Sequence, residues 1–345
     1  MLKLKKVLTV SIAAYNIANT LREVVEPFLM EDVINRVEVL IVDDGSKDDT
    51  AKIASEYQDK YPETFRLISK ENGGWGSTLN TGMRAAQGKY FKQLDGDDFF
   101  SYENLSDFLD YLEIADSDIV HSPFVTYSDK NGGILNVLND FSWKDYAHFP
   151  KRRTLYLSEC PGIRPEMHNF AIKVDVIKAN EITITEHCFY TDVELSLKAF
   201  NISETISFYD RPIYYYRLAF SGQSVGVGGI RKHYRENQKM LMLMLDYYTN
   251  EVKEPWAKKM MYERLVAVCD LMYRMYFALK CTRQQKKELI EYDRFLRENY
   301  EEFYKAVWSK PIATLRKTKF FGYWIISHML MSKERRQKIN FFEGE

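Results

Sequence analysis

Three carboxylates follow an apolar, strand-like segment, Tyr90 to Leu94: those of Asp95, Asp97 and Asp98, separated only by Gly96. Acidic side chains at the end of a strand repel one another and are poor core material. A hard divalent cation would neutralise them, since Mg²⁺ prefers oxygen ligands and usually holds one or two carboxylates plus substrate phosphates. The spacing therefore predicts a metal site that carries a phosphorylated ligand. A solvated acidic turn is the alternative that this stretch alone leaves open.

A second acidic pair, Asp43-Asp44, ends another predicted strand at residues 37–42. In a parallel sheet both strands would end at the same edge, where open α/β sheets bind their ligands. We therefore expect the two clusters to converge on one cleft. One would contact a ribose or base, while the other holds a metal against a diphosphate. The glycine-rich loop 72–76 belongs to the same rim, where glycine allows close backbone approach to a ligand.

The elements that must position these carboxylates alternate along the first third of the chain. Thr20 and Glu23 form a capping-box pattern at the start of the first helix, and Pro27 is expected to kink that helix. Strands alternating with helices of this length indicate a parallel sheet covered on both faces. The predicted strands are 7–12, 37–42, 65–68, 90–94 and 118–125, and the predicted helices are 20–29, 46–60, 78–87 and 102–114.

The pattern changes after about residue 126. Asn131-Gly132-Gly133 predicts a hairpin turn. Beyond residue 227, Met, Leu and Tyr recur at three- and four-residue spacing, which is typical of packed helices. We expect an α/β domain over residues 1–226 and a helical region over 227–345. Between them we predict helices at 173–179 and 192–200 and short strands at 206–209 and 213–217.

Composition excludes several classes of protein. The 345 residues are 46% hydrophobic and 28% charged, which is typical of globular chains. A net charge of −1 argues against a general nucleic-acid binder. The four cysteines form no CxxC pair, so neither a zinc site nor a disulfide framework is indicated. The start of the chain is too short and polar for a signal peptide, and no run of about 18 apolar residues predicts a membrane span. We expect a cytoplasmic protein.

Several segments in the right order over about residues 7–225 resemble family 2 glycosyltransferases with the GT-A fold. Asp95-Gly-Asp97-Asp98 stands where that family keeps its DXD motif. The resemblance implies a Rossmann-like, mostly parallel sheet flanked by helices, with a C-terminal helical extension. The other matching segments are 11–16 (SIAAYN), 39–48 (VLIVDDGSKD), 72–88 (NGGWGSTLNTGMRAAQG), 189–195 (FYTDVEL), 214–217 (YYYR) and 221–224 (SGQS).

The resemblance also implies roles on the donor side of a site. Tyr15 and Asp44 would line a nucleoside pocket, with Ala13 beside them. Asp95 would approach the ribose or the metal. Asp97 would ligate Mn²⁺ or Mg²⁺ bridging two phosphates of the donor.

Asp192 aligns with the aspartate that this family uses as catalytic base. An inverting transfer needs a base that takes the proton of the acceptor hydroxyl while the sugar leaves from the opposite face. Thr191 stands where the family usually has Glu. Glu194 is the fallback base, although it would point elsewhere on a helix, and a helix N-terminal role favoured by the macrodipole is the alternative for Asp192. Arg217 is a candidate contact for the departing diphosphate, since its fork matches phosphate geometry, with a surface salt bridge as its alternative.

The resemblance implies a metal-dependent inverting glycosyltransferase, a hexosyl- or N-acetylhexosaminyl-transferase in surface polysaccharide assembly. Its donor would be a nucleotide-sugar, most simply a UDP-sugar, and its acceptor a glycan or lipid-linked sugar. A phosphatase would need Thr or Val where Phe99 stands. A sugar nucleotidyltransferase would need a Gly-rich, Arg-containing loop after the first strand. A non-catalytic nucleotide-sugar-binding protein is a further alternative, which Thr191 favours.

Residues 316–338 place an apolar stretch between two basic clusters. The stretch is too short to span a bilayer. It would lie in the membrane interface with Lys and Arg facing anionic lipid, or form a last core helix with a solvated basic end. The first reading predicts peripheral contact with the inner face of the cell membrane.

Overall fold

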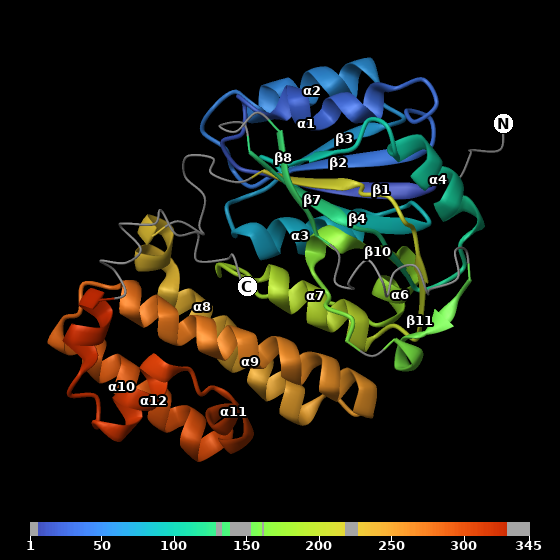
Figure 1. Ribbon diagram of the computed structural model, residues 1–345. Helices are drawn as coiled ribbons and strands as arrows, with labels where there is room; N and C mark the ends of the chain where they lie inside the picture. Colours follow the sequence, from blue (N-terminus) through green and yellow to red (C-terminus); the bar gives the residue numbers. More distant parts are fainter. Residues whose placement is uncertain (1–5, 129–132, 139–152, 161, 218–226, 330–345) are drawn as a thin grey trace. The chain divides into compact units, whose positions relative to one another are not determined.

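The computed structural model describes residues 6–128, 133–138, 153–160, 162–217 and 227–329 (Figure 1). The chain divides into two compact units, Met1–Phe220 and Ser221–Glu345. The first unit combines two sheets with helices, and the described part of the second is helical. Each unit is described by itself below.

The larger sheet of the first unit has eight strands in the order β3-β2-β1-β4-β10-β6-β11-β9. The four strands from β3 to β4 pair in parallel, whereas β10 runs antiparallel to both of its neighbours. The sheet is therefore mostly parallel, and the predicted fold class is confirmed. The bounds are β1 (Leu8–Ala14), β2 (Val37–Asp43), β3 (Phe65–Ser69), β4 (Tyr90–Asp95), β6 (Ile119–His121), β9 (Leu155–Tyr156), β10 (Phe170–Lys173) and β11 (Thr205–Phe208).

Almost every side chain on strands β1 and β2 is buried. Near-continuous apolar runs of this kind are typical of parallel strands covered on both faces. Helices α1 and α2 lie on one side of the sheet and α3, α6 and α7 on the other (Figure 1). Their bounds, with that of α4, are α1 (Leu21–Val25), α2 (Thr50–Lys60), α3 (Trp75–Ala85), α4 (Leu105–Ile114), α6 (Val174–Ala179) and α7 (Asp192–Asn201).

The first helix differs from its predicted form at both ends. Thr20 is the N-cap residue but its side chain makes no capping bond, so the predicted capping box is wrong. Its hydroxyl donates instead to the carbonyl of Gly96, at 2.6 Å, because that acceptor lies within reach in the folded chain. The α-helical part ends at Val25 and continues as the 3-10 helix η1 (Glu26–Leu29), which places the predicted kink at Pro27.

Two further helices begin at other residues than expected. Helix α2 begins at Thr50 rather than near Ser46, because the Ser46 hydroxyl accepts from the Asn16 N–H, at 2.9 Å, and so belongs to a loop. Helix α3 begins at Trp75, three residues early. Gly74 ends the preceding loop with a φ of 82°, a conformation that suits glycine.

The strand predicted over residues 118–125 is split at Ser122-Pro123 into β6 and β7 (Phe124–Ser128), since proline cannot donate to a ladder. The two parts belong to different sheets. The smaller sheet has the order β5-β12-β7-β8. Strands β7 and β8 (Gly133–Leu138) are antiparallel, while most of the predicted turn between them lies outside the described residues. Strands β5 (Phe99–Phe100) and β12 (Tyr214–Arg217) pair directly after the acidic turn.

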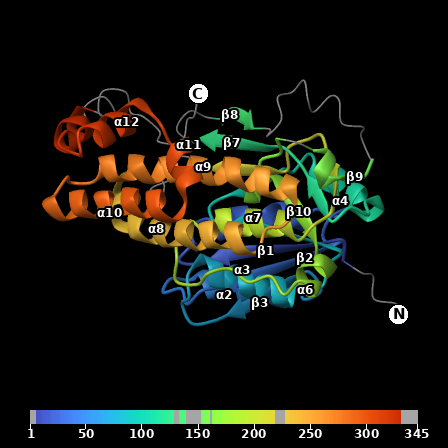
Figure 2. The ribbon, with the colours of Figure 1, turned by 90° about the horizontal axis from the view of Figure 1, so that it is seen from below.

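The second unit confirms the expected C-terminal helical region (Figure 2). Its core includes a buried network in which the Asp293 carboxylate accepts from the Tyr273 hydroxyl, at 2.7 Å, and from Arg316 Nε, at 2.8 Å. Among the described residues, no helix has the length and apolar character needed to cross a membrane. The helices are α8 (Val227–Asn250), α9 (Pro255–Ala278), α10 (Arg283–Asn299), α11 (Glu301–Ala306) and α12 (Lys310–Lys317).

Candidate active site

The acidic turn lies directly between β4 and β5. Carboxylate oxygens of Asp95, Asp97 and Asp98 all lie within 4.8 Å of one another. Gly96 is required inside this turn, because a Cβ there would lie 2.9 Å from the Ala13 carbonyl oxygen and 2.7 Å from Ile17. The close packing against the end of β1 therefore explains why a glycine separates the acidic residues.

Asp98 anchors this turn to β12. Its two carboxylate oxygens accept from the Tyr214 hydroxyl, at 2.6 Å, and from the Arg217 N–H, at 2.7 Å. Burial, followed by the charges of Asp97 and Asp95, holds the pKa of Asp98 well above its usual range. Because both oxygens already bind the protein, Asp98 holds the turn in place.

Asp95 is held on the other side of the turn by Trp75 at the start of α3. Trp75 Nε1 donates to Asp95 Oδ1 at 2.7 Å. Burial, and then the charge of Asp97, raises the pKa of Asp95 to about 7, and the charge of Asp192 also raises it to a smaller extent. Asp192 therefore lies within electrostatic reach of the acidic turn. Repulsion among these carboxylates is the condition that a bound divalent cation relieves.

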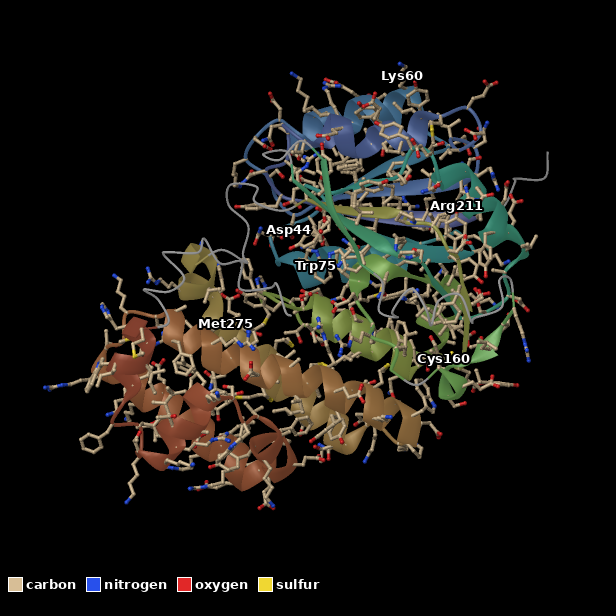
Figure 3. All side chains as sticks on the ribbon, in the orientation of Figure 1. Asp44, Lys60, Trp75, Cys160, Arg211 and Met275 are labelled. Carbon is tan, nitrogen blue, oxygen red and sulfur yellow. The ribbon has the colours of Figure 1, made fainter. Side chains whose placement is uncertain are left out.

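The end of β2 supplies the rest of this edge. The Asp44 carboxylate accepts from the N–H groups of Gly73 and Gly74, at 2.9 and 2.8 Å, and from Lys70 Nζ, at 2.8 Å. Its side chain is 3% exposed, so Asp44 organises the glycine-rich loop from inside. Asp44, which accepts from this loop, and Trp75, at the start of α3, are labelled in Figure 3. A direct contact of Asp44 with a nucleoside stays a prediction.

The predicted pocket residues on β1 are adjacent to both acidic strand ends. Ala13 pairs in register with Val42 on β2 and with Asp95 on β4. Tyr15 follows β1 directly and is 51% exposed. Because β2, β1 and β4 are neighbouring parallel strands, Ala13, Tyr15, Asp44, Asp95 and Asp97 gather at one edge of the sheet.

Asp192 is the first residue of α7, and its position depends on the loop before it. Within that loop His187 and Tyr190 have φ of 51° and 65°, a left-handed conformation that residues with a Cβ rarely adopt. Thr191, the N-cap residue, is buried, and its hydroxyl has no hydrogen-bond partner. Strained backbone of this kind persists only where surrounding structure fixes it, and it is frequent at functional sites.

Asn80 fixes this loop against α3. Asn80 Nδ2 donates to the Ile184 carbonyl, and the Ile184 N–H donates to Asn80 Oδ1, both at 2.8 Å. The His187 N–H donates to the Gly73 carbonyl at 2.6 Å. A Cβ on Gly76 would lie 2.2 Å from the Thr185 carbonyl oxygen, so loop and helix are in close contact. The loop that carries Asp192 is thereby joined to the loop that surrounds Asp44.

Glu194, the fallback base, faces the interior. It accepts from the Thr185 N–H, at 3.0 Å, and from Lys198 Nζ, at 2.7 Å. Its side chain is 3% exposed. Glu194 therefore holds the same loop from the side of α7.

The side chain of Arg217 is buried, whereas its alternative role predicted a surface position. Its guanidinium group forms an ion pair with Glu23 of α1 and lies 5.4 Å from the centre of the Phe99 ring. The Arg217 side chain is 5% exposed. The salt bridge of the alternative is therefore present, between a buried Arg217 and a Glu23 side chain that is 53% exposed. A contact between Arg217 and a diphosphate stays a prediction.

Three residues of the site had no assigned role in the sequence: Trp75, Asn80 and Tyr214. Asn80 lies on the same face of its helix as Gly76 and Met83, which sequence alone marks as a packing face. Tyr214 lies in an aromatic segment whose pattern predicts a buried strand. Their roles depend on hydrogen bonds to segments that are distant in the sequence. The one signal in the sequence is that each residue carries a polar atom in a segment whose pattern predicts burial, where that atom needs a partner.

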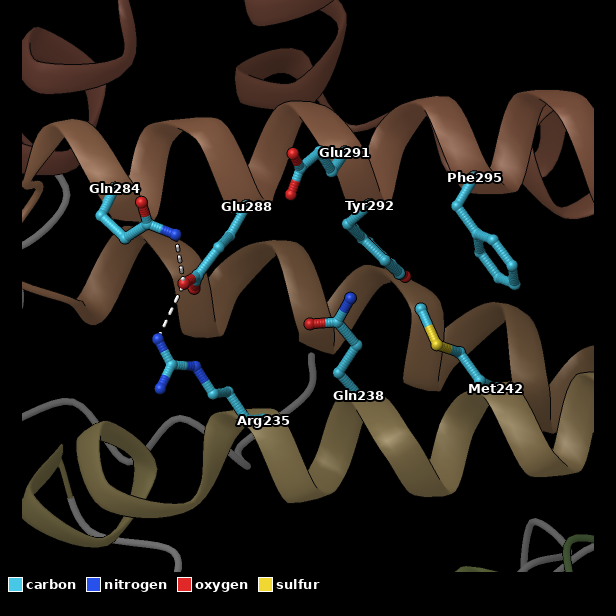
Figure 4. A pocket seen from close by; sticks show the side chains of 8 residues that line it. All are labelled: Arg235, Gln238, Met242, Gln284, Glu288, Glu291, Tyr292 and Phe295. Atoms are coloured by element: carbon cyan, nitrogen blue, oxygen red, sulfur yellow. Dashed lines mark hydrogen bonds and ion pairs between the residues drawn. The ribbon is translucent and has the colours of Figure 1, made fainter.

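A pocket of about 560 Å³ lies between α8 and α10 of the helical unit (Figure 4). Its charged groups are already paired: Glu288 accepts from Arg235 Nη2, from the Tyr234 hydroxyl, both at 2.7 Å, and from Gln284 Nε2, at 3.1 Å. Glu291, which also lines the pocket, pairs with Lys287 at 3.7 Å, so among the described residues the pocket offers no unpaired charge to select a ligand. We assign no ligand to it.

The mostly parallel sheet, the helices on both faces and the acidic turn after β4 define a GT-A fold. TarS residues 1–349 of S. aureus, solved in complex with UDP-GlcNAc, has the same fold, with a TM-score of 0.62. The likeness covers 98% of this chain and 97% of that one, at 18% sequence identity. At this identity the likeness concerns the fold alone.

Residues 9–178 match the model of glycosyl transferase family 2, and this part of the chain belongs to that family. An uncharacterised glycosyltransferase of Rickettsia prowazekii is 30% identical over 199 residues, which cover 56% of this chain and 59% of the relative. The minor teichoic acid biosynthesis protein GgaB of Bacillus subtilis is 28% identical over 215 residues, 61% of this chain and 23% of the relative. The chain thus spans three fifths or less of these relatives. The predicted family is confirmed.

Proposed function

We propose that this protein is a metal-dependent, inverting glycosyltransferase that moves a hexosyl or N-acetylhexosaminyl group from a UDP-sugar to a glycan or lipid-linked acceptor. The observation that carries the proposal is the gathering of Asp95 and Asp97 at the end of β4, within electrostatic reach of Asp192. Membership in glycosyl transferase family 2 supports it. The UDP-GlcNAc bound by TarS supports a UDP-sugar, and the name of GgaB supports a place in surface polysaccharide assembly.

The donor would lie along the ends of β1, β2 and β4. The exposed ring of Tyr15 offers a surface on which a base can stack. The carboxylates of Asp95 and Asp97 fit a Mg²⁺ or Mn²⁺ ion, since these hard cations take oxygen ligands and the oxygens lie within 4.8 Å of one another. A bound cation would act there as a Lewis acid that offsets charge developing on the diphosphate.

The acceptor hydroxyl would approach from the side of α7. The Asp192 carboxylate takes its proton as the new glycosidic bond forms and the bond to the diphosphate breaks. A carboxylate is a weak base for an alcohol, so the rate depends on its position more than on its basicity. The loop held by Asn80 and Glu194 supplies that position.

The proposal also includes the location: the cytoplasm, at the inner face of the cell membrane, where a lipid-linked acceptor would be available. The family relation supports the acceptor class, and the C-terminal region would supply peripheral contact with the membrane.

The first test is thermal unfolding of the full chain with UDP-, GDP- and dTDP-sugars, with and without Mn²⁺. A ligand that binds only the folded state raises the unfolding temperature according to its occupancy, about 2.7 kcal/mol at one hundred times Kd. We expect a shift with a UDP-sugar that needs Mn²⁺. No shift with any donor in Mn²⁺ would sink the donor-binding claim, whereas a shift without donor hydrolysis or transfer would favour a non-catalytic binder.

Asn80→Ala is expected to lower kcat by about 10²-fold and to leave donor affinity within about twofold. The reason is that the variant releases Ile184 and with it the loop before Asp192, and a misplacement of about 1 Å is sufficient for such a loss. Initial rates at saturating and subsaturating donor measure the two quantities. The matched control is Asn180→Ala, which removes an exposed amide bonded only to its own helix at the Val176 carbonyl. An equal loss in both variants, or a loss confined to donor affinity, contradicts the positioning role.

A further inference from the structure

Large apolar side chains project into solvent near the described end of the helical unit. Residues 323–329 form a helical stretch beyond α12. Phe321, which precedes this stretch, and Trp324 and Ile325 within it are 81%, 47% and 66% exposed, whereas Phe320 and Tyr323 are buried. Some apolar side chains of this region thus pack in the core, and others are exposed to solvent. We name Phe321, Trp324 and Ile325 the apolar patch.

The turn before the patch is fixed in an unusual conformation. Lys319 and Phe320 have φ of 47° and 63°, in the left-handed region that residues with a Cβ rarely adopt. The buried Phe320 ring and a hydrogen bond from its N–H to the Leu315 carbonyl, at 2.7 Å, hold them there. Since strained residues persist only where packing over-determines them, Phe321 is directed outward by a defined structure.

A lysine lies directly over the two aromatic rings. Lys286 Nζ on α10 is 5.4 Å from the centre of the Phe321 ring and 4.8 Å from that of Trp324. Trp324 Nε1 also donates to the Cys281 carbonyl. The patch is therefore a fixed surface with a cation at its centre.

Further basic residues lie close in sequence to the patch or to its contact residues Cys281 and Lys286. Lys280, Arg283, Lys317 and Lys319 are all exposed. Within the part of the chain that the structure describes, none of these four forms an ion pair. The chain continues with more basic residues outside the described range: Lys333, Arg335, Arg336 and Lys338.

We propose that the apolar patch docks on a lipid bilayer whose surface carries anionic headgroups. Aromatic side chains with a polar edge are stable at the boundary between headgroups and acyl chains. Each Lys or Arg close to an anionic bilayer is attracted to it, and an apolar face bordered by cations is characteristic of surface-bound segments. A second copy of this chain would bring like charges together, so the unpaired cations favour lipid. The inference deepens the membrane contact that the proposed function includes and rests on it for the location, but it does not depend on the proposed reaction.

The test is flotation of the full chain with vesicles at about 0.1 M salt. We expect it to float with vesicles of phosphatidylcholine and phosphatidylglycerol in equal parts, and far less with phosphatidylcholine alone. Phe321→Ser with Ile325→Ser should lower the partition coefficient about tenfold or more, since two apolar side chains leave the interface. Lys317→Gln with Lys319→Gln should lower it about tenfold on the anionic vesicles, as should salt of about 0.5 M.

The matched control is Ile114→Ser, which removes an apolar side chain that is 64% exposed on α4. This variant should float like the unchanged protein. Urea unfolding and the donor-dependent thermal shift verify that the patch variants are folded, because the substituted side chains lie outside the core. Flotation that is absent, equal on both vesicles, or unchanged in the patch variant overturns the proposal. A dimer that forms without flotation and is lost in the patch variant also overturns it, and would assign the surface to a second copy.

Discussion

Asp97→Asn is expected to abolish Mn²⁺-dependent stabilisation by the donor and to lower kcat/KM at least about 10³-fold. In the proposed site this change would remove a charged ligand and weaken the hold on a cation whose contact with the diphosphate would be worth several kcal/mol in the transition state. At about 1.4 kcal/mol for each factor of ten, three such factors lie within that range. Thermal shift with Mn²⁺ and donor, and initial transfer rates, measure the two effects.

The apo form of this variant should be at least as stable as the unchanged protein. Asp97 is a neighbour whose charge raises the pKa of both Asp95 and Asp98, so its loss relieves repulsion in the absence of metal. The matched control is Asp175→Asn, which neutralises an exposed carboxylate on α6. A donor shift that remains dependent on Mn²⁺ in Asp97→Asn would show that the ion is held elsewhere.

Asp192→Asn is expected to lower the transfer rate by about 10²- to 10⁴-fold while donor binding stays intact. The amide has nearly the same shape as the carboxylate but cannot take the acceptor proton, and general-base catalysis contributes a factor of this size. The separation of binding from chemistry is the distinguishing result. Donor thermal shift and single-turnover transfer measure the two parts.

Glu194→Gln provides the contrast for this variant. Glu194 is buried and accepts from Thr185 and Lys198, so its neutralisation should reduce stability by about 1–3 kcal/mol. The folded enzyme should remain active, because the Gln amide oxygen can still accept from the Thr185 N–H and hold the loop. Urea unfolding reports the stability, and activity below the transition reports the chemistry. If Glu194→Gln were inactive and Asp192→Asn active, the assignment of the base would be reversed.

Much of the candidate site was predictable because it depends on local signals. Alternating apolar runs and helical patterns predicted the strands that end at Asp43 and Asp95, since both periods are local properties of the chain. Parallel strands joined by helices then require their carboxyl ends to share one edge. The glycine of the acidic turn was also visible, although its reason, the close approach of Ala13 and Ile17, was not.

Other predictions from local sequence patterns were wrong, because contacts within the folded chain decided the structure there. Thr20 had the spacing of a capping box, but its hydroxyl donates to Gly96, 76 residues further along the chain. The strand predicted over 118–125 was divided at Pro123, and β10 entered the sheet in the opposite direction. The direction of β10 depends on the path of the chain between distant elements, and hydrophobic periodicity does not contain that information.

The sequence by itself determined the residue types that can do chemistry here and the strand ends that carry them. Tertiary structure alone decided how they are held: Asp95 by Trp75, Asp98 by Tyr214 and the loop before Asp192 by Asn80. These bonds join residues as far as 116 positions apart. A buried polar group must find a partner, but which partner lies in reach is set by the packing of whole elements, and a local pattern does not encode it.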